Sequence, residues 1–204
     1  MRNYLTYKDG DLYIEYIGVK DLAKKFKTPL YVYSFSEIER RFKELKRICV
    51  EQGVKHLICF SLKSNSSYGI ISFLRGLGAG AEVVSGGELF RALNAGFSSK
   101  NIVFSGVGKT VEEIEYAIKK RVLVINIESQ EEFEDVVRIT EKLKIKQNIG
   151  FRIKFDFDTL SNIHPSLRVG EKTSKFALSE NEVRELFKES KKAKYVKANT
   201  LHFH

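Results

Sequence analysis

The sequence predicts an α/β protein built as a TIM-type (β/α)8 barrel, of which about six strands are present within 204 residues. Short apolar runs rich in β-branched and aromatic residues alternate with longer segments of helical period, which is typical of a parallel sheet covered by helices. A Ser or Thr followed three residues later by Glu marks five helix starts. Neither GxGxxG nor GxxxxGK[ST] occurs, so an open nucleotide-binding sheet loses its main support and a barrel is favoured.

The first part of the chain does not continue this repeat. Residues 10–27 have the pattern of a strand and a short amphipathic helix, TPLYVYS at 28–34 that of a strand, and residues 37 to about 48 that of a helix. We therefore expect residues 1–27 to contribute to a second domain, of β type. Residues 28–204 should form the barrel domain, incomplete at its C-terminal end.

The barrel region contains six expected strands and five expected helices. The strands cover residues 58–62, 81–84, 102–105, 122–127, 149–155 and 198–203, and the helices cover 67–76, 87–95, 111–120, 130–144 and 180–193. The capping pairs are Ser34/Glu37, Ser85/Glu88, Thr110/Glu113, Ser129/Glu132 and Ser179/Glu182. Gly76 and Gly96 stand where a left-handed residue would end a helix. Because the chain stops near the end of a predicted strand, we expect it to be truncated.

Composition argues against several other classes of protein. The formal charge is +9, but Lys and Arg alternate with Asp and Glu in runs such as EIERRFKELKR, which indicates a charged surface rather than a nucleic-acid partner. Cys49 and Cys59 lack the spacing of a zinc site and are interpreted as reduced thiols in the core. No signal peptide or apolar run of about 18 residues is present, so we expect a cytoplasmic protein without a membrane partner.

Residues that could carry chemistry stand at the carboxyl ends of the predicted strands, where barrels of this type place their working side chains. They are Lys63, Glu82, Ser105, Gly106, Asn126, Glu128, Arg152 and His204. An amine, carboxylates, a guanidinium and an imidazole together suit a cofactor that needs a Schiff-base lysine and a tuned aromatic ring.

Each of these residues also has a simpler explanation. Lys63 follows an apolar run, where partial desolvation would make its amine nucleophilic, yet it is one lysine among many. Glu88 is accounted for by its capping pair. Arg152 lies within a predicted buried strand, so it needs a partner or an anionic ligand. His202 and His204 share a face of one strand, but two ligands without a third make a weak metal site, and no metal is expected.

Six segments resemble the diaminopimelate decarboxylase family in order and spacing. They are TPLYVYS, FSLKSNSS, GAGAEVVSGGELFRALNAG, IVFSGVGKT, HPSLRVGEKTSKFAL and TLHFH. This family belongs to the group IV decarboxylases, which share a barrel with alanine racemase. The resemblance implies a Schiff base between pyridoxal 5'-phosphate and Lys63, with His204 stacked on the cofactor ring. It also places Glu82 and Arg152 near the cofactor, and matches Glu88 to a recurrent acid.

The activity implied by the resemblance is decarboxylation of meso-2,6-diaminopimelate to L-lysine, in a homodimer with shared active sites. In relatives the phosphate-binding loop, the acid at the pyridine nitrogen and a catalytic cysteine and tyrosine lie beyond the position of His204, so we expect the isolated chain to be inactive. Two alternatives stay open. One is a sister decarboxylase acting on ornithine, arginine or carboxynorspermidine, and the other is a non-catalytic relative that binds pyridoxal phosphate or regulates an enzyme.

Overall fold

A computed structural model describes residues 4–154 and 177–204 of the chain. The chain divides into two compact units, Met1–His56 and Leu57–His204, and each is described here by itself. The expected domain division after residue 27 stays a prediction. The stretch from His164 to Phe176, on which part of the family resemblance depends, lies outside the described residues.

The first unit contains a small antiparallel sheet and two helices. Strands β1 (Leu5–Lys8), β2 (Asp11–Ile14) and β3 (Ile17–Gly18) pair in sequence order, and α1 (Val19–Phe26) and α2 (Phe35–Glu51) follow. Gly10 supplies the positive φ of 82° in the turn between β1 and β2. Phe42 is the only buried hydrophobic residue that the structure describes in this unit.

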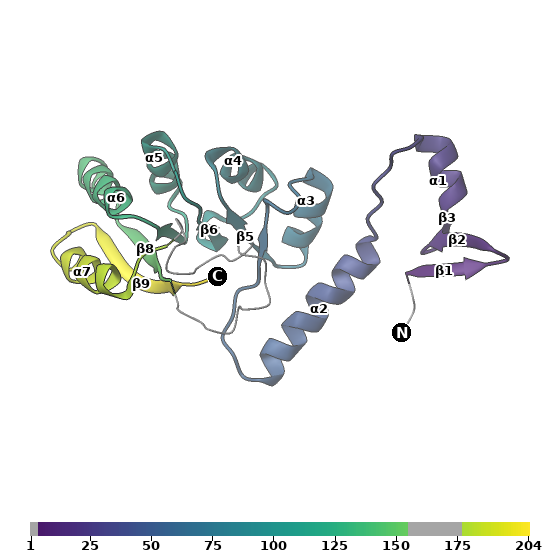
Figure 1. Ribbon diagram of the computed structural model, residues 1–204, viewed down its shortest axis with the longest axis horizontal. Helices are drawn as coiled ribbons and strands as arrows, with labels where there is room; N and C mark the ends of the chain where they lie inside the picture. Colours follow the sequence, from purple (N-terminus) through teal and green to yellow (C-terminus); the bar gives the residue numbers. More distant parts are fainter. Residues whose placement is uncertain (1–3, 155–176) are drawn as a thin grey trace. The chain divides into compact units, whose positions relative to one another are not determined.

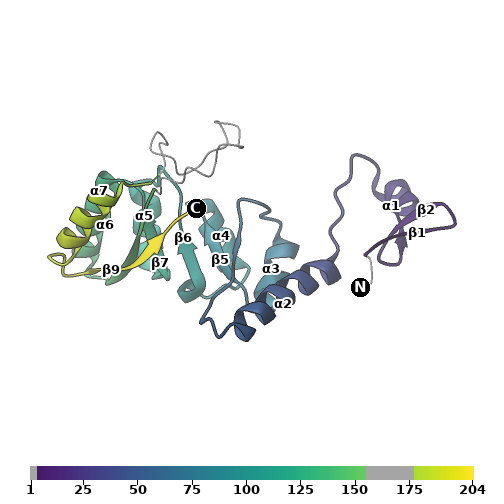
Figure 2. The ribbon, with the colours of Figure 1, turned by 60° about the horizontal axis from the view of Figure 1, so that its bottom comes forward.

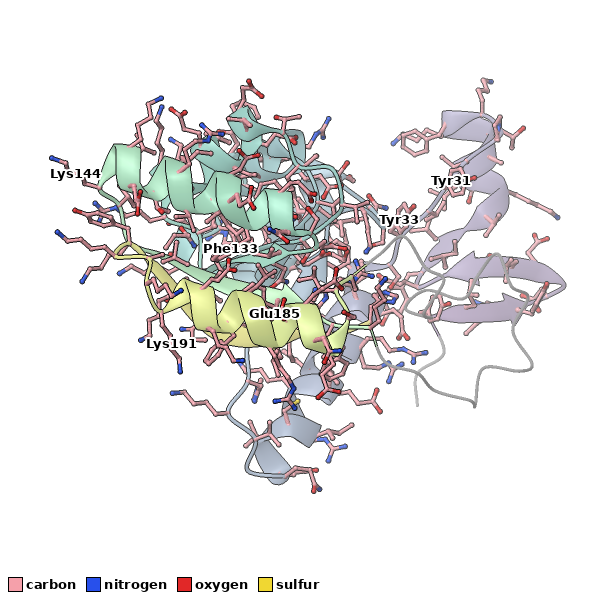
Figure 3. The ribbon with its side chains drawn as sticks, turned by 60° about the vertical axis from the view of Figure 1, so that its left-hand side comes forward. Tyr31, Tyr33, Phe133, Lys144, Glu185 and Lys191 are labelled. Atoms are coloured by element: carbon pink, nitrogen blue, oxygen red, sulfur yellow. The ribbon has the colours of Figure 1, made fainter. Side chains whose placement is uncertain are left out.

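The strand predicted at residues 28–34 is wrong. This segment connects α1 to α2 and pairs with no other described segment. Tyr31 and Tyr33, labelled in Figure 3, are 85% and 53% exposed. Aromatic and β-branched residues favour strands because they pack on a sheet surface. The described residues offer no such surface to this segment, and Pro29 has no backbone donor for a ladder.

The second unit is a parallel six-stranded sheet. Its strands are β4 (Cys59–Ser61), β5 (Gly80–Val83), β6 (Ile102–Phe104), β7 (Val124–Ile127), β8 (Gln147–Arg152) and β9 (Val196–His202), paired in that order. An open doubly wound sheet reverses its strand order, whereas a barrel keeps it sequential. The predicted α/β class and the partial barrel of six strands are therefore confirmed.

Helices alternate with these strands and lie outside the curve of the sheet (Figures 1 and 2). They are α3 (Tyr68–Gly76), α4 (Gly86–Asn94), α5 (Val111–Lys120), α6 (Gln130–Leu143) and α7 (Glu180–Ser190), and the 3-10 turn η1 (Ser99–Asn101) precedes β6. Phe133 on α6 packs against Phe151 on β8 with ring centroids 6.0 Å apart, while Lys144 beyond the same helix projects from the surface (Figure 3). Within the described residues, no helix combines the length and apolarity needed to cross a membrane.

The helix starts follow the predicted capping device. In all five pairs the Ser or Thr side chain accepts a hydrogen bond from the backbone N–H of the Glu. Thr110/Glu113 and Ser179/Glu182 complete the reciprocal box. At the helix ends, Gly96 has the expected positive φ, but Gly76 lies inside α3 and Gly78 takes the left-handed conformation instead. The prediction that Gly76 takes the left-handed conformation at the helix end is wrong, since the residue that does so lies two positions later.

Candidate functional site

The inner face of the second unit and the carboxyl ends of its strands line a hollow of about 790 Å³. Its polar lining includes Lys63, Glu82, Ser105, Asn126, Arg152, His202 and His204. Gly106 also lines it, and Glu128 lies buried beside it. The structure thus brings together the residues that the sequence analysis selected at the strand ends.

Lys63 lies two residues beyond β4, on the open side of this hollow. Its side chain is exposed and makes no hydrogen bond or ion pair with another described residue. The partial desolvation expected from the sequence is therefore not provided by the described residues. Nearby, the Ser61 hydroxyl donates to the carboxylate of the half-buried Glu82 on β5. This side of the hollow offers an accessible amine beside an acidic group.

Arg152, the last residue of β8, is buried on the opposite side of the hollow. Its Nη1 donates to Oε1 and Oε2 of Glu128 at 3.0 and 2.8 Å, and the two residues are 8% and 6% exposed. Glu128 is thus the buried partner that the sequence required for Arg152. Its Oε1 also accepts from the backbone N–H of Gly106 at 2.9 Å. A carboxylate held at two points fixes the guanidinium at the edge of the hollow.

Gly106 needs to be glycine at this point of the chain. Its φ is 103°, a conformation that residues with a side chain rarely adopt. A Cβ there would lie 3.2 Å from Cβ and 3.3 Å from the carbonyl oxygen of Val84. The loop after β6 therefore packs its backbone directly against the end of β5, which brings the Gly106 N–H to Glu128.

Lys109, whose side chain is buried, is a residue to which the sequence analysis assigned no role. Its Nζ donates to the carbonyl oxygens of Gly106 at 2.6 Å and Asn126 at 2.8 Å, and to Glu132 Oε1 at 2.5 Å. Burial raises the pKa of Glu132, and the Lys109 ammonium acts against this shift. Two features of the sequence could have indicated this pair. Lys109 stands beside glycines in GVGKT directly after a strand, and Glu132 stands in the first turn of α6.

Two further residues of the hollow keep unsatisfied polar atoms. Asn126 donates from Nδ2 to Ser105 Oγ at 3.0 Å, but its Oδ1 is buried without a partner among the described residues. The half-buried His202 has a buried Nδ1 that also lacks a hydrogen-bond partner among the described residues. Burial, and next the Arg152 charge, lower the pKa of His202. The sequence analysis weighed His202 only as a metal ligand, whereas His204 is exposed at the edge.

Glu88 does not line the hollow. Its backbone N–H is capped by Ser85, and its carboxylate accepts from the backbone N–H of Val84 at 2.9 Å, one residue before the cap. Glu88 thereby links the end of β5 to the start of α4. This structural role is sufficient to explain a glutamate at this position. Among the residues that the structure describes, no cluster of three or more His, Cys, Asp or Glu side chains could hold a metal ion.

Chemically, the hollow offers an accessible amine on one side and a fixed guanidinium on the other. An amine of this kind can form an imine with a carbonyl compound. The buried Arg152 adds a cation, and the buried Asn126 and half-buried His202 each add one unsatisfied polar atom. These groups suit a polar ligand that carries negative charge.

Comparison with known proteins gives one family and a consistent set of relatives. Residues 35–204 match the family model described as pyridoxal-dependent decarboxylase, pyridoxal binding domain. Diaminopimelate decarboxylase of Helicobacter pylori J99 is 41% identical over 91% of this chain and 45% of its own length. That of Aquifex aeolicus is 37% identical over 98% of this chain and 46% of its own length. The chain thus spans about half the length of the curated relatives it matches.

Solved structures give the same result. Diaminopimelate decarboxylase from M. jannaschii, in complex with L-lysine, has a TM-score of 0.87 at 32% identity, over 98% of this chain and 47% of that one. The Helicobacter pylori enzyme complexed with L-lysine has a TM-score of 0.85 at 40% identity, over 91% and 46%. A viral arginine decarboxylase, from Paramecium bursaria Chlorella virus, shares the fold at 17% identity, with a TM-score of 0.73 over 91% and 46%.

Proposed function

Because this chain belongs to the family of pyridoxal-dependent decarboxylases and carries their pyridoxal-binding domain, we propose that it forms the cofactor-binding part of a diaminopimelate decarboxylase. The reaction is the conversion of meso-2,6-diaminopimelate to L-lysine and carbon dioxide. Its support is the agreement among relatives at 36–41% identity. The activity is proposed for the complete protein, since this chain spans about half the length of the relatives it matches.

The residues of the hollow fit pyridoxal phosphate, and one observation carries this conclusion. An exposed amine, Lys63, shares a hollow with the fixed Arg152 cation and with buried polar atoms that lack partners among the described residues. We assign Lys63 as the residue that binds the cofactor carbonyl covalently. Glu82, Arg152 and His204 complete the proposed set of cofactor contacts.

Each of these side chains has a distinct task in the proposed site. When bound, pyridoxal phosphate supplies an aromatic ring that accepts the electron pair left by departing carbon dioxide. Lys63 would hold the cofactor covalently through its carbonyl carbon. Arg152, held by Glu128, presents a positive charge to an oxygen of the ligand. Glu82 would contribute a hydrogen-bond acceptor, and the imidazole of His204 would contact the cofactor ring.

A homodimer with shared active sites and a cytoplasmic location complete the proposal. The bulk of the first unit's apolar side chains are exposed among the described residues, Tyr7 and Tyr16 at 77% and 83%, which suits a unit that is covered elsewhere in an assembly. Sedimentation of the complete gene product at catalytic concentration tests the dimer. An active monomer would overturn that part of the proposal.

The decisive experiment for the function uses the complete gene product loaded with pyridoxal phosphate. Carbon dioxide release is measured with meso-2,6-diaminopimelate, ornithine, arginine and carboxynorspermidine in parallel. We expect turnover of diaminopimelate to exceed the others. Faster turnover of another substrate identifies a sister decarboxylase, and cofactor binding without turnover of any of them identifies a non-catalytic relative.

The 204-residue chain is the matched preparation in the same assays. We expect it to show no turnover and to lose pyridoxal phosphate on dialysis, since its sheet leaves two strand edges unpaired among the described residues. Stoichiometric retention of the cofactor together with turnover would show that these 204 residues suffice for activity.

A further inference from the structure

Lys109 is a half-buried residue in the loop after β6, and its side chain is fully enclosed. Its side chain is 0% exposed, and the Glu132 side chain that it contacts is 9% exposed. A lysine ammonium has three donor hydrogens, and three acceptors surround this one, Gly106 O, Asn126 O and Glu132 Oε1. The Phe104 ring lies below it, with the centroid 5.7 Å from Nζ. An amine whose donors are all used and which no solvent reaches cannot serve as a nucleophile.

The partners of Lys109 are also the groups that hold Glu128. The backbone N–H of Gly106 donates to Glu128 Oε1 at 2.9 Å, and the Gly106 carbonyl on the other side of the same residue accepts from Lys109. Glu132 Oε2 accepts from the backbone N–H of Glu128 at 3.1 Å, while its Oε1 binds Lys109. Apart from its ion pair with Arg152, Glu128 is thus held by hydrogen bonds to Gly106 and Glu132, and Lys109 binds both of these residues.

Charge balance explains why a cation is needed at position 109. Glu128 and Glu132 are two buried acids four positions apart, and each carboxylate has one buried cation against it, Arg152 and Lys109 respectively. Removal of Lys109 leaves Glu132 buried without its charge partner, so the acid takes up a proton or moves toward solvent. Either change alters the contact with the Glu128 backbone.

We infer that Lys109 is a positioning residue for Arg152 in the proposed cofactor site, acting through Gly106, Glu132 and Glu128. This inference rests on the proposed function, because it concerns the site at which Arg152 meets the cofactor. Lys109 itself does not line the hollow. Its effect reaches the ligand only through the placement of the guanidinium.

The test separates positioning from plain stabilisation of the fold. Lys109→Met removes the charge, Lys109→Arg keeps it, and Lys109→Met combined with Glu132→Gln removes both charges of the buried pair. Lys119→Met, in an exposed pair with Glu115 on α5, is the surface control. In the complete gene product, the readouts are the dissociation constant of pyridoxal phosphate, the midpoint of urea unfolding, and amide hydrogen exchange of the 105–109 segment in the cofactor-free protein.

We expect Lys109→Met to lower the urea midpoint and the double variant to recover most of that loss, since no buried charge stays uncompensated. Cofactor binding of the double variant stays weaker by about tenfold, as expected for loss of one charge-assisted contact, and the 105–109 amides exchange faster. Lys109→Arg and Lys119→Met keep affinity close to that of the natural protein. If affinity and exchange in the double variant return with the urea midpoint, Lys109 has only a stabilising role and the inference is wrong.

Failure of the proposed function gives a different result. In that case the unaltered protein itself shows no covalent attachment of pyridoxal phosphate at Lys63, whatever the Lys109 variants do. If the unaltered protein binds the cofactor at Lys63 and the double variant binds it equally well, only the inference on Lys109 fails.

Discussion

Two lysines at the carboxyl ends of the strands have opposite surroundings. Lys63, after β4, is exposed and has no hydrogen bond to another described residue. The side chain of Lys109, after β6, is 0% exposed and donates to three acceptors. An amine that must react with a carbonyl compound has to be reachable and not committed to other bonds, whereas a buried amine needs all its donors satisfied. The ends of β4 and β6 are therefore built for different tasks, one for reaction and one for fixed geometry.

The largest effect is expected at Lys63. In the complete gene product, Lys63→Met should lower decarboxylation of diaminopimelate by about 10³-fold or more, as for loss of a covalent nucleophile. Its urea midpoint should change little, because an exposed side chain contributes within about 0.5 kcal/mol. A variant that keeps more than about a tenth of the activity would break the contrast between the two lysines.

The next effect concerns the buried side of the hollow. Glu128→Gln removes the carboxylate that compensates the buried Arg152, so unfolding should become easier by about 3 kcal/mol. Glu115→Gln, which disrupts the ion pairs of a partly exposed carboxylate with the exposed Lys119 and Lys142, should cost less than about 1 kcal/mol. Both are measured by urea unfolding of the complete gene product. Equal losses of stability in the two variants would mean that burial does not make the Glu128–Arg152 pair more important to the fold than a surface pair.

Gly150 on β8 tests the packing of that same side. A Cβ there would lie 2.4 Å from Asn126 Oδ1 and 3.1 Å from Cβ of Thr200, so Gly150→Ala should destabilise the fold by about 1–3 kcal/mol. Gly76 is the control, because a Cβ at this helical position would meet nothing within 4 Å and Gly76→Ala should be neutral or slightly stabilising. A neutral Gly150→Ala would show that Asn126 can move freely.

The smallest effect is a dependence on pH. Burial first, and then the Arg152 charge with a contribution from His204, lower the pKa of His202 from 6.5, against the opposing charges of Glu128 and Glu82. Below pH 6.5 the unfolded chain therefore binds the proton more readily than the folded chain, so stability falls as the pH drops through this range. Thermal unfolding of His202→Asn should depend less on pH there. An unchanged slope would contradict the assignment.

The succession of elements was predictable from the sequence because local signals agreed with the fold. Ser129, for example, caps α6 just after the buried strand β7, as the Ser–Glu spacing indicates. The strand expected at 28–34 was not found, because strand formation depends on a partner that propensity does not reveal. The predicted terminator Gly76 failed for a related reason, since Gly78 close by could fill the same role.

The candidate site was predictable to the extent that strand ends identify it. Lys63, Glu82, Arg152 and His204 all line the hollow, and their roles toward the cofactor stay predictions. Lys109 could not be found in this way, because it lies in a loop and its partners are two carbonyl oxygens and one acid 23 residues away. Every residue has a backbone carbonyl oxygen, so the sequence does not show which of them will accept a hydrogen bond from Lys109. His202 was visible in the sequence, but the burial of its Nδ1 without a partner among the described residues appears only in the folded structure.

The contrast between the two lysines is tested most directly by locating the cofactor on the chain. The complete gene product is loaded with pyridoxal phosphate and reduced with borohydride, and the labelled peptide is identified by mass spectrometry after proteolysis. The account predicts one label, on Lys63, and none on Lys109. A label on any other lysine, with Lys63 unmodified, would contradict it.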